Sequence, residues 1–422
     1  MKSVVSRSPL AGVRILDLTI VVAGPVGAGV LGDLGAEVIK IEHLIARRDV
    51  SDALPMAAGG AEDRPWNRSN WFFDLNRSKK GITLNLAVQQ ARQAFLELVA
   101  LSDVVMENFS PRVMPNLGLE YDVLRQANRD IIVVSMPGFG STGPMRDRTA
   151  FGPGIEAMTG LADLTGYLGG PPLKPGNYVT DYNAALLAAF TIMAALHYRR
   201  RTGRGQHIEI ALREGALQMI GEPMMDYAMN RRTQMRIGNR HPSTAPHGMY
   251  PCRGEDRWIA IAVGSDEEWA SLRHAMGDPP WAQEERFSTA AGRLKHQDAL
   301  DRHLTAWTGT QEALVLTRRL QAAGVNAAAA LTTKDIAEDP HYRERGFIQE
   351  VELPEAGQAW YPRYGFQLSR TPVVTGAGPG FGEHNRAVLG DLLGIGDQAL
   401  ADLAEKKATA GRPLAPSELP RP

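Results

Sequence analysis

The sequence predicts an α/β protein with a doubly wound parallel sheet and a second, smaller α+β region. In the first half, short apolar runs alternate with helix-like segments, as they do in parallel α/β sheets. The residue composition changes near Tyr227, where a basic segment rich in turn-forming residues begins. The chain has 422 residues, which exceeds the usual size of a single hydrophobic core. Two domains are therefore expected.

Apolar runs mark the strands of the expected sheet, and helix-like segments at 23–34 and 87–102 separate them. Ligands of such sheets bind outside the carboxyl ends of the strands. The turns after Leu18, Glu42, Phe109 and Ser135 are therefore the expected places for chemistry. The expected strands are 13–18, 36–42 and 81–86, and the segments 103–109 and 130–140 each combine a strand with the turn that follows it.

The second half is expected to begin with a crossing segment and to continue as a small α+β block. Its strand is predicted at 258–263, with helices to about Leu331, and the chain becomes loop-rich again near Asp339. A last helix is expected at 386–393. The tail from Lys406 contains four prolines, so we expect it to fray.

The composition restricts the possible partners and the compartment. The net charge is −1, which gives no support for a nucleic-acid or membrane-surface protein. The single cysteine, Cys252, cannot form an internal disulfide and has no metal-ligand spacing around it, so no metal is expected. The longest apolar stretch, 184–196, is short for a membrane span, and no signal peptide is recognised. We expect a soluble cytoplasmic protein.

Three glycines, Gly27, Gly29 and Gly32, spell the GxGxxG pattern of dinucleotide-binding loops. That pattern would favour a nicotinamide-dependent dehydrogenase. However, residues 19–26 separate it from the preceding strand, and Pro25 stands where a helix begins. We therefore favour small residues for close helix packing.

Asp181 stands just before the apolar segment that starts at Ala184. A carboxylate there can cap the helix, which is a common structural role. It can also attack a thioester carbonyl. The positive end of the helix dipole is expected to keep Asp181 ionised.

Six blocks resemble, in order, those of class III CoA-transferases, the family of formyl-CoA and carnitine CoA-transferases. They extend from Leu10 to Gly394, and the fifth contains Asp181. The blocks are "LAGVRILDLTIVVAGPVGAGVLGDLGAEVIKIE", "LNRSKKGITLNL", "DVVMENFSPRVMPNLGL", "VVSMPGFGSTGP", the stretch from Asp181 to "RRRTGRGQHIEIAL", and "LSRTPVV…GPGFGEHNRAVLGDLLG".

The resemblance implies CoA transfer from an acyl-CoA to a small carboxylic acid, with Asp181 as the nucleophile. Aspartyl anhydride and aspartyl-CoA thioester intermediates are expected, and CoA is a substrate rather than a permanently bound cofactor. The implied fold has a Rossmann-like large domain, 1–226 and 340–422, and a small domain, 227–339. Two such chains interlock as a homodimer, and a heteromer with a paralogous subunit is the alternative assembly.

The resemblance also implies positions for CoA contacts. Val22 and Ala23 match the adenine-side turn, and His43 stands where some members carry Arg. Gly138 belongs to a glycine-bearing turn that can supply part of an oxyanion site. Leu84 matches the adenine-pocket strand, and Asn108 and Phe109 match the pantetheine-contacting turn. Leu84 and Phe109 can equally be core residues.

The expected phosphate contacts depart from the family. Ala87, Asn116 and Pro137 stand where members carry Lys or Arg. Substitute cations near these turns are Arg47, Arg48 and Arg112, which are otherwise ordinary surface residues. Two further functions stay open. An α-methylacyl-CoA racemase shares the fold, although its "GHD" signature is absent, and a non-catalytic subunit would fit the lost cations.

Overall fold

The computed structural model describes residues 8–45, 64–353 and 355–419. The chain divides into two compact units, which are described separately. Helix α10 (Gly221–Asn230) continues across the boundary expected after residue 226. The larger unit comprises Met1–Ala162, Lys174–Arg231 and Glu344–Pro422, and the smaller one Asp163–Leu173 and Arg232–Arg343.

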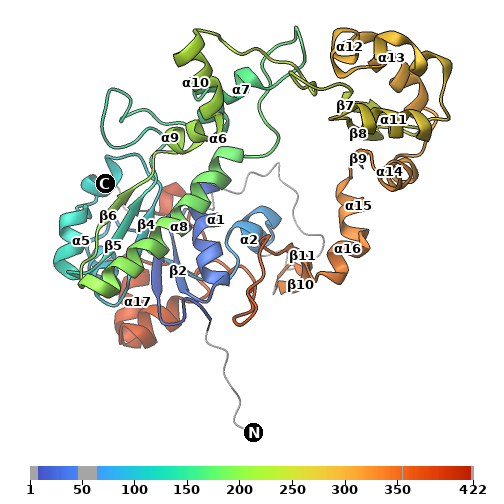
Figure 1. Ribbon diagram of the computed structural model, residues 1–422. Helices are drawn as coiled ribbons and strands as arrows, with labels where there is room; N and C mark the ends of the chain where they lie inside the picture. Colours follow the sequence, from blue (N-terminus) through green and yellow to red (C-terminus); the bar gives the residue numbers. More distant parts are fainter. Residues whose placement is uncertain (1–7, 46–63, 354, 420–422) are drawn as a thin grey trace. The chain divides into compact units, whose positions relative to one another are not determined.

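A six-stranded parallel sheet forms the centre of the larger unit, in the order β3-β2-β1-β4-β5-β6. Its strands β2, β4, β5 and β6 are labelled in Figure 1. The predicted parallel α/β fold is confirmed, whereas β6 was not predicted because it is short and largely exposed. The order reverses at β1, which pairs with both β2 and β4. The strands are β1 (Arg14–Asp17), β2 (Glu37–Glu42), β3 (Lys79–Thr83), β4 (Val104–Glu107), β5 (Ile132–Ser135) and β6 (His207–Glu209).

Helices cover both faces of the sheet. Ile15 and the residues on its face pack against α1 (Ala23–Asp33) and α8 (Val179–Thr202). Leu16 and its neighbours pack on the opposite face against α3 (Gln89–Ala100) and α5 (Tyr121–Ala127), because successive side chains of a strand alternate. Because both faces of the sheet are covered by apolar packing, the strands are continuous apolar runs in the sequence.

Helix α8 is longer than the sequence predicted. It begins at Val179, whereas the sequence placed its start at Ala184. The sequence missed both ends of the helix because its first turn and its arginine-rich last turn are polar and lack the apolar pattern. Its length and composition would allow it to cross a membrane, but 44% of its most apolar window is buried inside the protein. It lies alongside α1 in Figure 1 and packs as a core helix, with Leu186 and Phe190 exposed on its other side.

The three glycines of the GxGxxG pattern all lie within α1. A Cβ on Gly27 would lie 3.0 Å from the backbone oxygen of Ala185 on α8, and one on Gly32 would lie 2.8 Å from the Ser78 oxygen. Gly27 and Gly32 therefore permit close backbone packing, which supports the structural interpretation, whereas a Cβ on Gly29 would lie no nearer than 3.5 Å to another group.

The carboxyl-terminal segment packs against the rest of the larger unit between residues 406 and 419, where fraying was expected. Ala408 and Leu414 are buried, and the Leu414 amide donates a hydrogen bond to the Leu44 oxygen at 2.7 Å. Thr83 at the end of β3 donates to Ala410 at 2.7 Å. The tail thus covers the ends of two strands.

The remaining elements of residues 64–230 and 344–419 are α2 (Asn70–Leu75), α4 (Val113–Asn116), α6 (Gly152–Met158), α7 (Leu161–Leu164), α9 (Leu212–Leu217), β10 (Ile348–Leu353), β11 (Gly357–Pro362), the π-helix Arg386–Leu392 and α17 (Asp397–Glu405).

The smaller unit contains a three-stranded antiparallel sheet in the order β7-β8-β9, packed against helices. The strand predicted at 258–263 corresponds to β8 (Trp258–Ala262). Trp269, Phe287 and Leu304 lie in its core, which also buries Cys252. The remaining elements are β7 (His247–Pro251), β9 (Asn326–Ala329), α11 (Asp266–Ala275), α12 (Ala290–Lys295), α13 (Gln297–Thr308), α14 (Ala313–Ala322), α15 (Thr333–Glu338) and α16 (Pro340–Glu344).

Candidate active site

The residues predicted to contact CoA all follow strands of the parallel sheet, so they lie along its carboxyl edge. Between β1 and β4 the strand order reverses, and crevices at such points bind ligands in open α/β sheets. Val22 and Ala23 follow β1, His43 follows β2, Leu84 follows β3, Asn108 and Phe109 follow β4, and Gly138 follows β5.

Asp181 lies in the first turn of α8, as the third residue of the helix. The N-cap is Tyr178, so Asp181 does not occupy the capping position suggested by the sequence. Its side chain is buried, and the backbone N–H of Ala23 lies close enough to its carboxylate to lower its pKa. The start of α1 and the start of α8 therefore meet at this carboxylate, and Ala23 is the predicted site residue that the structure brings to Asp181.

The backbone N–H groups at the helix end lower the pKa of Asp181, as the sequence predicted, but the net shift is in the opposite direction. Burial, together with the negative charge of Glu156, raises the pKa of Asp181 to about 6. The backbone N–H groups of Asp181 and Ala23 oppose this shift without cancelling it. The sequence did not identify Glu156, which precedes Asp181 by 25 positions and reaches it from another helix.

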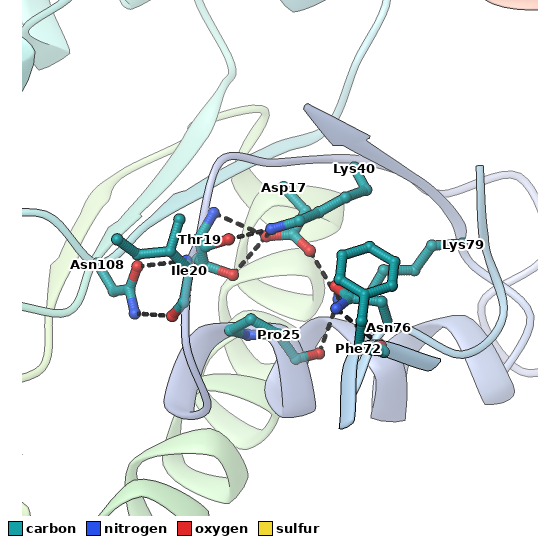
Figure 2. A network of polar contacts seen from close by, with 9 residues as sticks. All are labelled: Asp17, Thr19, Ile20, Pro25, Lys40, Phe72, Asn76, Lys79 and Asn108. Atoms are coloured by element: carbon teal, nitrogen blue, oxygen red, sulfur yellow. Dashed lines mark hydrogen bonds and ion pairs between the residues drawn. The ribbon is translucent and has the colours of Figure 1, made fainter. Parts of the chain in front are cut away.

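A network of polar contacts links the loop between β1 and α1 to Lys40 on β2 and Lys79 on β3 (Figure 2). Asp17 ends β1, and its Oδ1 accepts hydrogen bonds from the Thr19 amide at 2.9 Å and the Thr19 hydroxyl. Lys40 donates to the Thr19 carbonyl oxygen. Lys79 donates to Asp17 Oδ2 and to the Pro25 oxygen, both at 2.8 Å. These hydrogen bonds therefore fix the loop and the first turn of α1 against strands β2 and β3.

Lys79 is fully buried and has a third acceptor, Asn76 Oδ1 at 3.0 Å. Burial lowers the pKa of its ammonium group to about 8, although the charge of Asp17 opposes the shift. A buried ion pair with every donor satisfied is costly to break, because the remaining partner keeps an uncompensated charge. Lys79 thus fixes the start of α1 relative to β1.

Asn108 closes the same loop from the side of β4. Its Oδ1 accepts from the Ile20 amide at 2.8 Å, and its Nδ2 donates to the Ile20 oxygen at 2.7 Å (Figure 2). The next residue, Val21, has a φ of 66°, which is an unfavourable conformation for a β-branched residue. Both amide atoms of Asn108 are engaged in bracing this loop, a role that the sequence did not suggest.

A cavity of about 120 Å³ opens at the ends of β4 and β5. Phe109, Met114 and Pro137 contribute to its apolar wall. Glu107 and His207 line its polar side, and Ser135 joins them: it hydrogen-bonds to the Glu107 carboxyl and lies 2.9 Å from His207 Nε2. Burial raises the pKa of Glu107 and lowers that of His207. Phe109 is thus the predicted CoA contact that lines a cavity.

The other predicted contacts differ in accessibility. Val22 and Leu84 are buried in apolar clusters, whereas His43 is exposed. Gly138 is half-buried, and its carbonyl oxygen accepts a hydrogen bond from the Arg213 amide at 3.0 Å. The side chains of Val22 and Leu84 therefore contribute to the core.

The substitute cations are only partly described. Arg47 and Arg48 lie outside the described residues, and Arg112 is exposed beside the cavity-lining Pro111. Arg92 was missed in the sequence: it donates to the Leu86 and Ala87 oxygens at 3.3 Å, which brings a guanidinium to the position where a cation was expected. Within residues 8–45, 64–353 and 355–419, no cluster of His, Cys, Asp and Glu is arranged to hold a metal ion.

Comparisons with known proteins extend along nearly the whole chain. The sequence model of CoA-transferase family III matches residues 10–385. A succinyl-CoA–D-citramalate CoA-transferase of Chloroflexus aurantiacus is 36% identical over 400 residues, 94% of this chain and 98% of that protein. The beta subunit of the succinyl-CoA–L-malate CoA-transferase of that organism is 33% identical over 416 residues, 96% of this chain and 100% of that protein. A CAIB/BAIF family protein from Brucella suis has a similar solved structure, with a TM-score of 0.84 and 31% identity, covering 92% of this chain and 100% of that one.

Proposed function

The chain is a CoA-transferase that belongs to CoA-transferase family III, and we propose that Asp181 is the nucleophile on which it transfers CoA. The observation that carries this proposal is the Asp181 carboxylate itself. It is buried at the meeting point of α1 and α8 and lies close to the Ala23 amide. Anionic nucleophiles gain reactivity when water is excluded, provided that the reacting geometry is fixed.

In the proposed first step, an Asp181 oxygen attacks the thioester carbonyl carbon of the acyl-CoA. The C–S bond breaks, CoA leaves as the thiolate with the electron pair, and a mixed anhydride remains on Asp181. The thiolate then attacks the aspartyl carbonyl and expels the donor's carboxylate, which gives an aspartyl-CoA thioester. The anhydride and thioester conserve the activation of the substrate as long as water is kept away.

The acceptor carboxylate next attacks the aspartyl thioester and expels CoA thiolate, so that a second anhydride forms. Thiolate attacks the acceptor-derived carbonyl, and the Asp181 carboxylate is regenerated. Each tetrahedral intermediate carries an oxyanion that needs preorganised N–H donors. The braced loop with Val22 and Ala23 is the proposed source of one donor, because its backbone is fixed by Asp17, Lys79 and Asn108.

For the substrates we propose succinyl-CoA as the donor and a small dicarboxylic acid as the acceptor. The relatives named above carry succinyl-CoA and D-citramalate or L-malate in their names. The cavity beside Phe109 is proposed to take part of the CoA moiety, and Arg92 or Arg112 its phosphates. Arginine suits phosphate because its guanidinium presents several fixed donors.

We further propose that the chain works as a homodimer in the cytoplasm. Leu186, Phe190 and Met193 are exposed on one side of α8, and Met225 and Met229 are exposed on α10. Apolar surfaces of this kind favour association. One relative is a beta subunit, which makes a pair of non-identical chains the second candidate assembly.

The test is transfer by the chain purified alone. Succinyl-CoA is incubated with a panel of carboxylic acids, product thioesters are separated by chromatography, and size is measured by light scattering. The proposal expects transfer by a homodimer and none by Asp181→Asn or Asp181→Ala of unchanged fold. Full activity in either variant would contradict it. Proton exchange at the α-carbon in heavy water without acceptor would point to the racemase instead.

A further inference from the structure

A second carboxyl group accompanies Asp181. Glu156 on α6 is completely buried, and its Oε1 accepts a hydrogen bond from the Val179 amide at 3.2 Å, in the first turn of α8. Among the described residues, neither Glu156 Oε2 nor Asp181 Oδ2 has a hydrogen-bond partner. Buried polar atoms without partners are rare in proteins and call for an explanation.

Helix α6 faces Asp181 along its first turn. A Cβ on Gly152, the first residue of the helix, would overlap Asp181 Oδ2. Glu156 follows one turn later on the same helix, so its side chain points to the same end of α8. The absence of a side chain at Gly152 therefore leaves room for the two carboxyl groups to approach.

Within the part of the chain that the structure describes, no cationic side chain forms an ion pair with Glu156 or Asp181. From α8, Tyr182 adjoins Asp181, and its pKa is raised partly by the Asp181 charge. From α1, the group that reaches Asp181 is the neutral Ala23 amide. Asp74 and Arg77 act on Tyr182, whereas the charge that acts on Asp181 is that of Glu156.

We propose that Glu156 is a positioning residue for the reaction, which repels the free Asp181 carboxylate and thereby favours its conversion into a neutral acyl group. This inference rests on the proposed function. When Asp181 attacks the thioester and CoA thiolate leaves, the aspartyl oxygen becomes part of a neutral anhydride. The repulsion between two buried carboxylates then disappears. It returns only when the second anhydride is cleaved and the Asp181 carboxylate is regenerated.

The charge of Glu156 also affects the protonation of Asp181. Burial raises the pKa of Asp181, and the nearby negative charge of Glu156 raises it further. A protonated Asp181 cannot attack the thioester. Glu156 therefore favours the acylated state at neutral pH and raises the pH below which activity is lost.

The experiment compares Glu156→Gln with the wild-type chain. Glutamine keeps the size of the side chain and an oxygen for the Val179 amide, but it removes the charge. Two quantities are measured: the pH profile of kcat/KM, and the fraction of Asp181 trapped as hydroxamate by hydroxylamine in the steady state. We expect the acidic limb of the kcat/KM profile, where activity falls as the pH decreases, to move about one pH unit lower. The trapped fraction of Asp181 should fall about tenfold.

Two further variants separate this role from stability. Asp33→Asn removes another buried carboxyl group, one that accepts hydrogen bonds from Ser78 and Thr375. Because Asp33 does not act on the Asp181 carboxylate, this variant should leave the acidic limb where it is in the wild-type chain. Glu156→Asp keeps the charge and should retain the wild-type limb. A limb displaced as far as that of Glu156→Gln would contradict a role for the charge.

The outcomes distinguish the two proposals. If Asp181 is trapped equally in the wild-type chain and Glu156→Gln, with one common acidic limb, Glu156 has no such role and the proposed function stands. If active wild-type protein gives no hydroxamate at Asp181, the nucleophile assignment fails, and the role of Glu156 fails with it.

Discussion

Gly152→Ala is the sharpest test of the space around Asp181. The new Cβ would overlap Asp181 Oδ2 and lie 3.1 Å from its Cγ, so the carboxyl group would have to move by roughly 1 Å to restore ordinary contacts. A displacement of this size at a reacting atom costs about 100-fold in rate. The expected result is a fall of kcat/KM by about two orders of magnitude, carried mainly by kcat.

Gly154→Ala provides the matched control on the same helix. There the atom nearest to the new Cβ is Ala150 Cβ at 3.5 Å, an ordinary contact distance. Both substitutions favour the helix by up to about 1 kcal/mol, so a change in helix propensity cannot explain a difference between them. Steady-state kinetics with succinyl-CoA and an acceptor acid would decide the question. Equal activity in the two variants would refute the close contact between α6 and Asp181.

Three more expectations concern stability and pH. Lys79→Met should lower the free energy of unfolding by about 3 kcal/mol because Asp17 loses a buried partner, whereas Lys80→Met breaks an exposed pair and should cost under about 1 kcal/mol. Urea denaturation measures both, and equal losses would contradict the buried network. Because the pKa of Asp181 is raised to about 6, its ionisation destabilises the fold above that pH. Asp181→Asn should therefore be more stable than the wild-type chain by about 1–3 kcal/mol at pH 8, with the difference closing toward about pH 4, and a variant less stable at pH 8 would oppose this. In the wild-type chain, kcat/KM should fall about tenfold per unit below pH 6; a profile flat to pH 5 would count against a titrating nucleophile.

The sheet could be predicted from the sequence because its strands are local apolar runs. Runs such as 13–18 and 103–109 gave the positions of β1 and β4 to within two residues. The turns after these strands lie at the carboxyl edge of the parallel sheet, where the sequence predicts the site. By contrast, β6 contains only His207–Glu209 and is half-exposed, so it offers no apolar run to recognise.

The environment of Asp181 could not be predicted, because it depends on contacts between distant segments. The sequence showed a helix start, which favours an ionised carboxylate. Burial between α1 and α6 and the charge of Glu156 reverse that effect, and neither is visible in the local sequence. Asn108 illustrates the same limit: its match to a family position suggested a ligand contact, whereas its amide braces Ile20.

The most direct test of Asp181 as the nucleophile follows an oxygen atom. The enzyme is loaded with CoA from succinyl-CoA and then completes one turnover with an acceptor acid whose carboxylate carries oxygen-18. In the proposed route an acceptor oxygen bridges to the aspartyl carbonyl and stays on Asp181 when CoA attacks the acceptor-derived carbonyl. Mass spectrometry should find one heavy oxygen in the Asp181 peptide. An unlabelled Asp181 after a productive turnover would contradict the covalent mechanism.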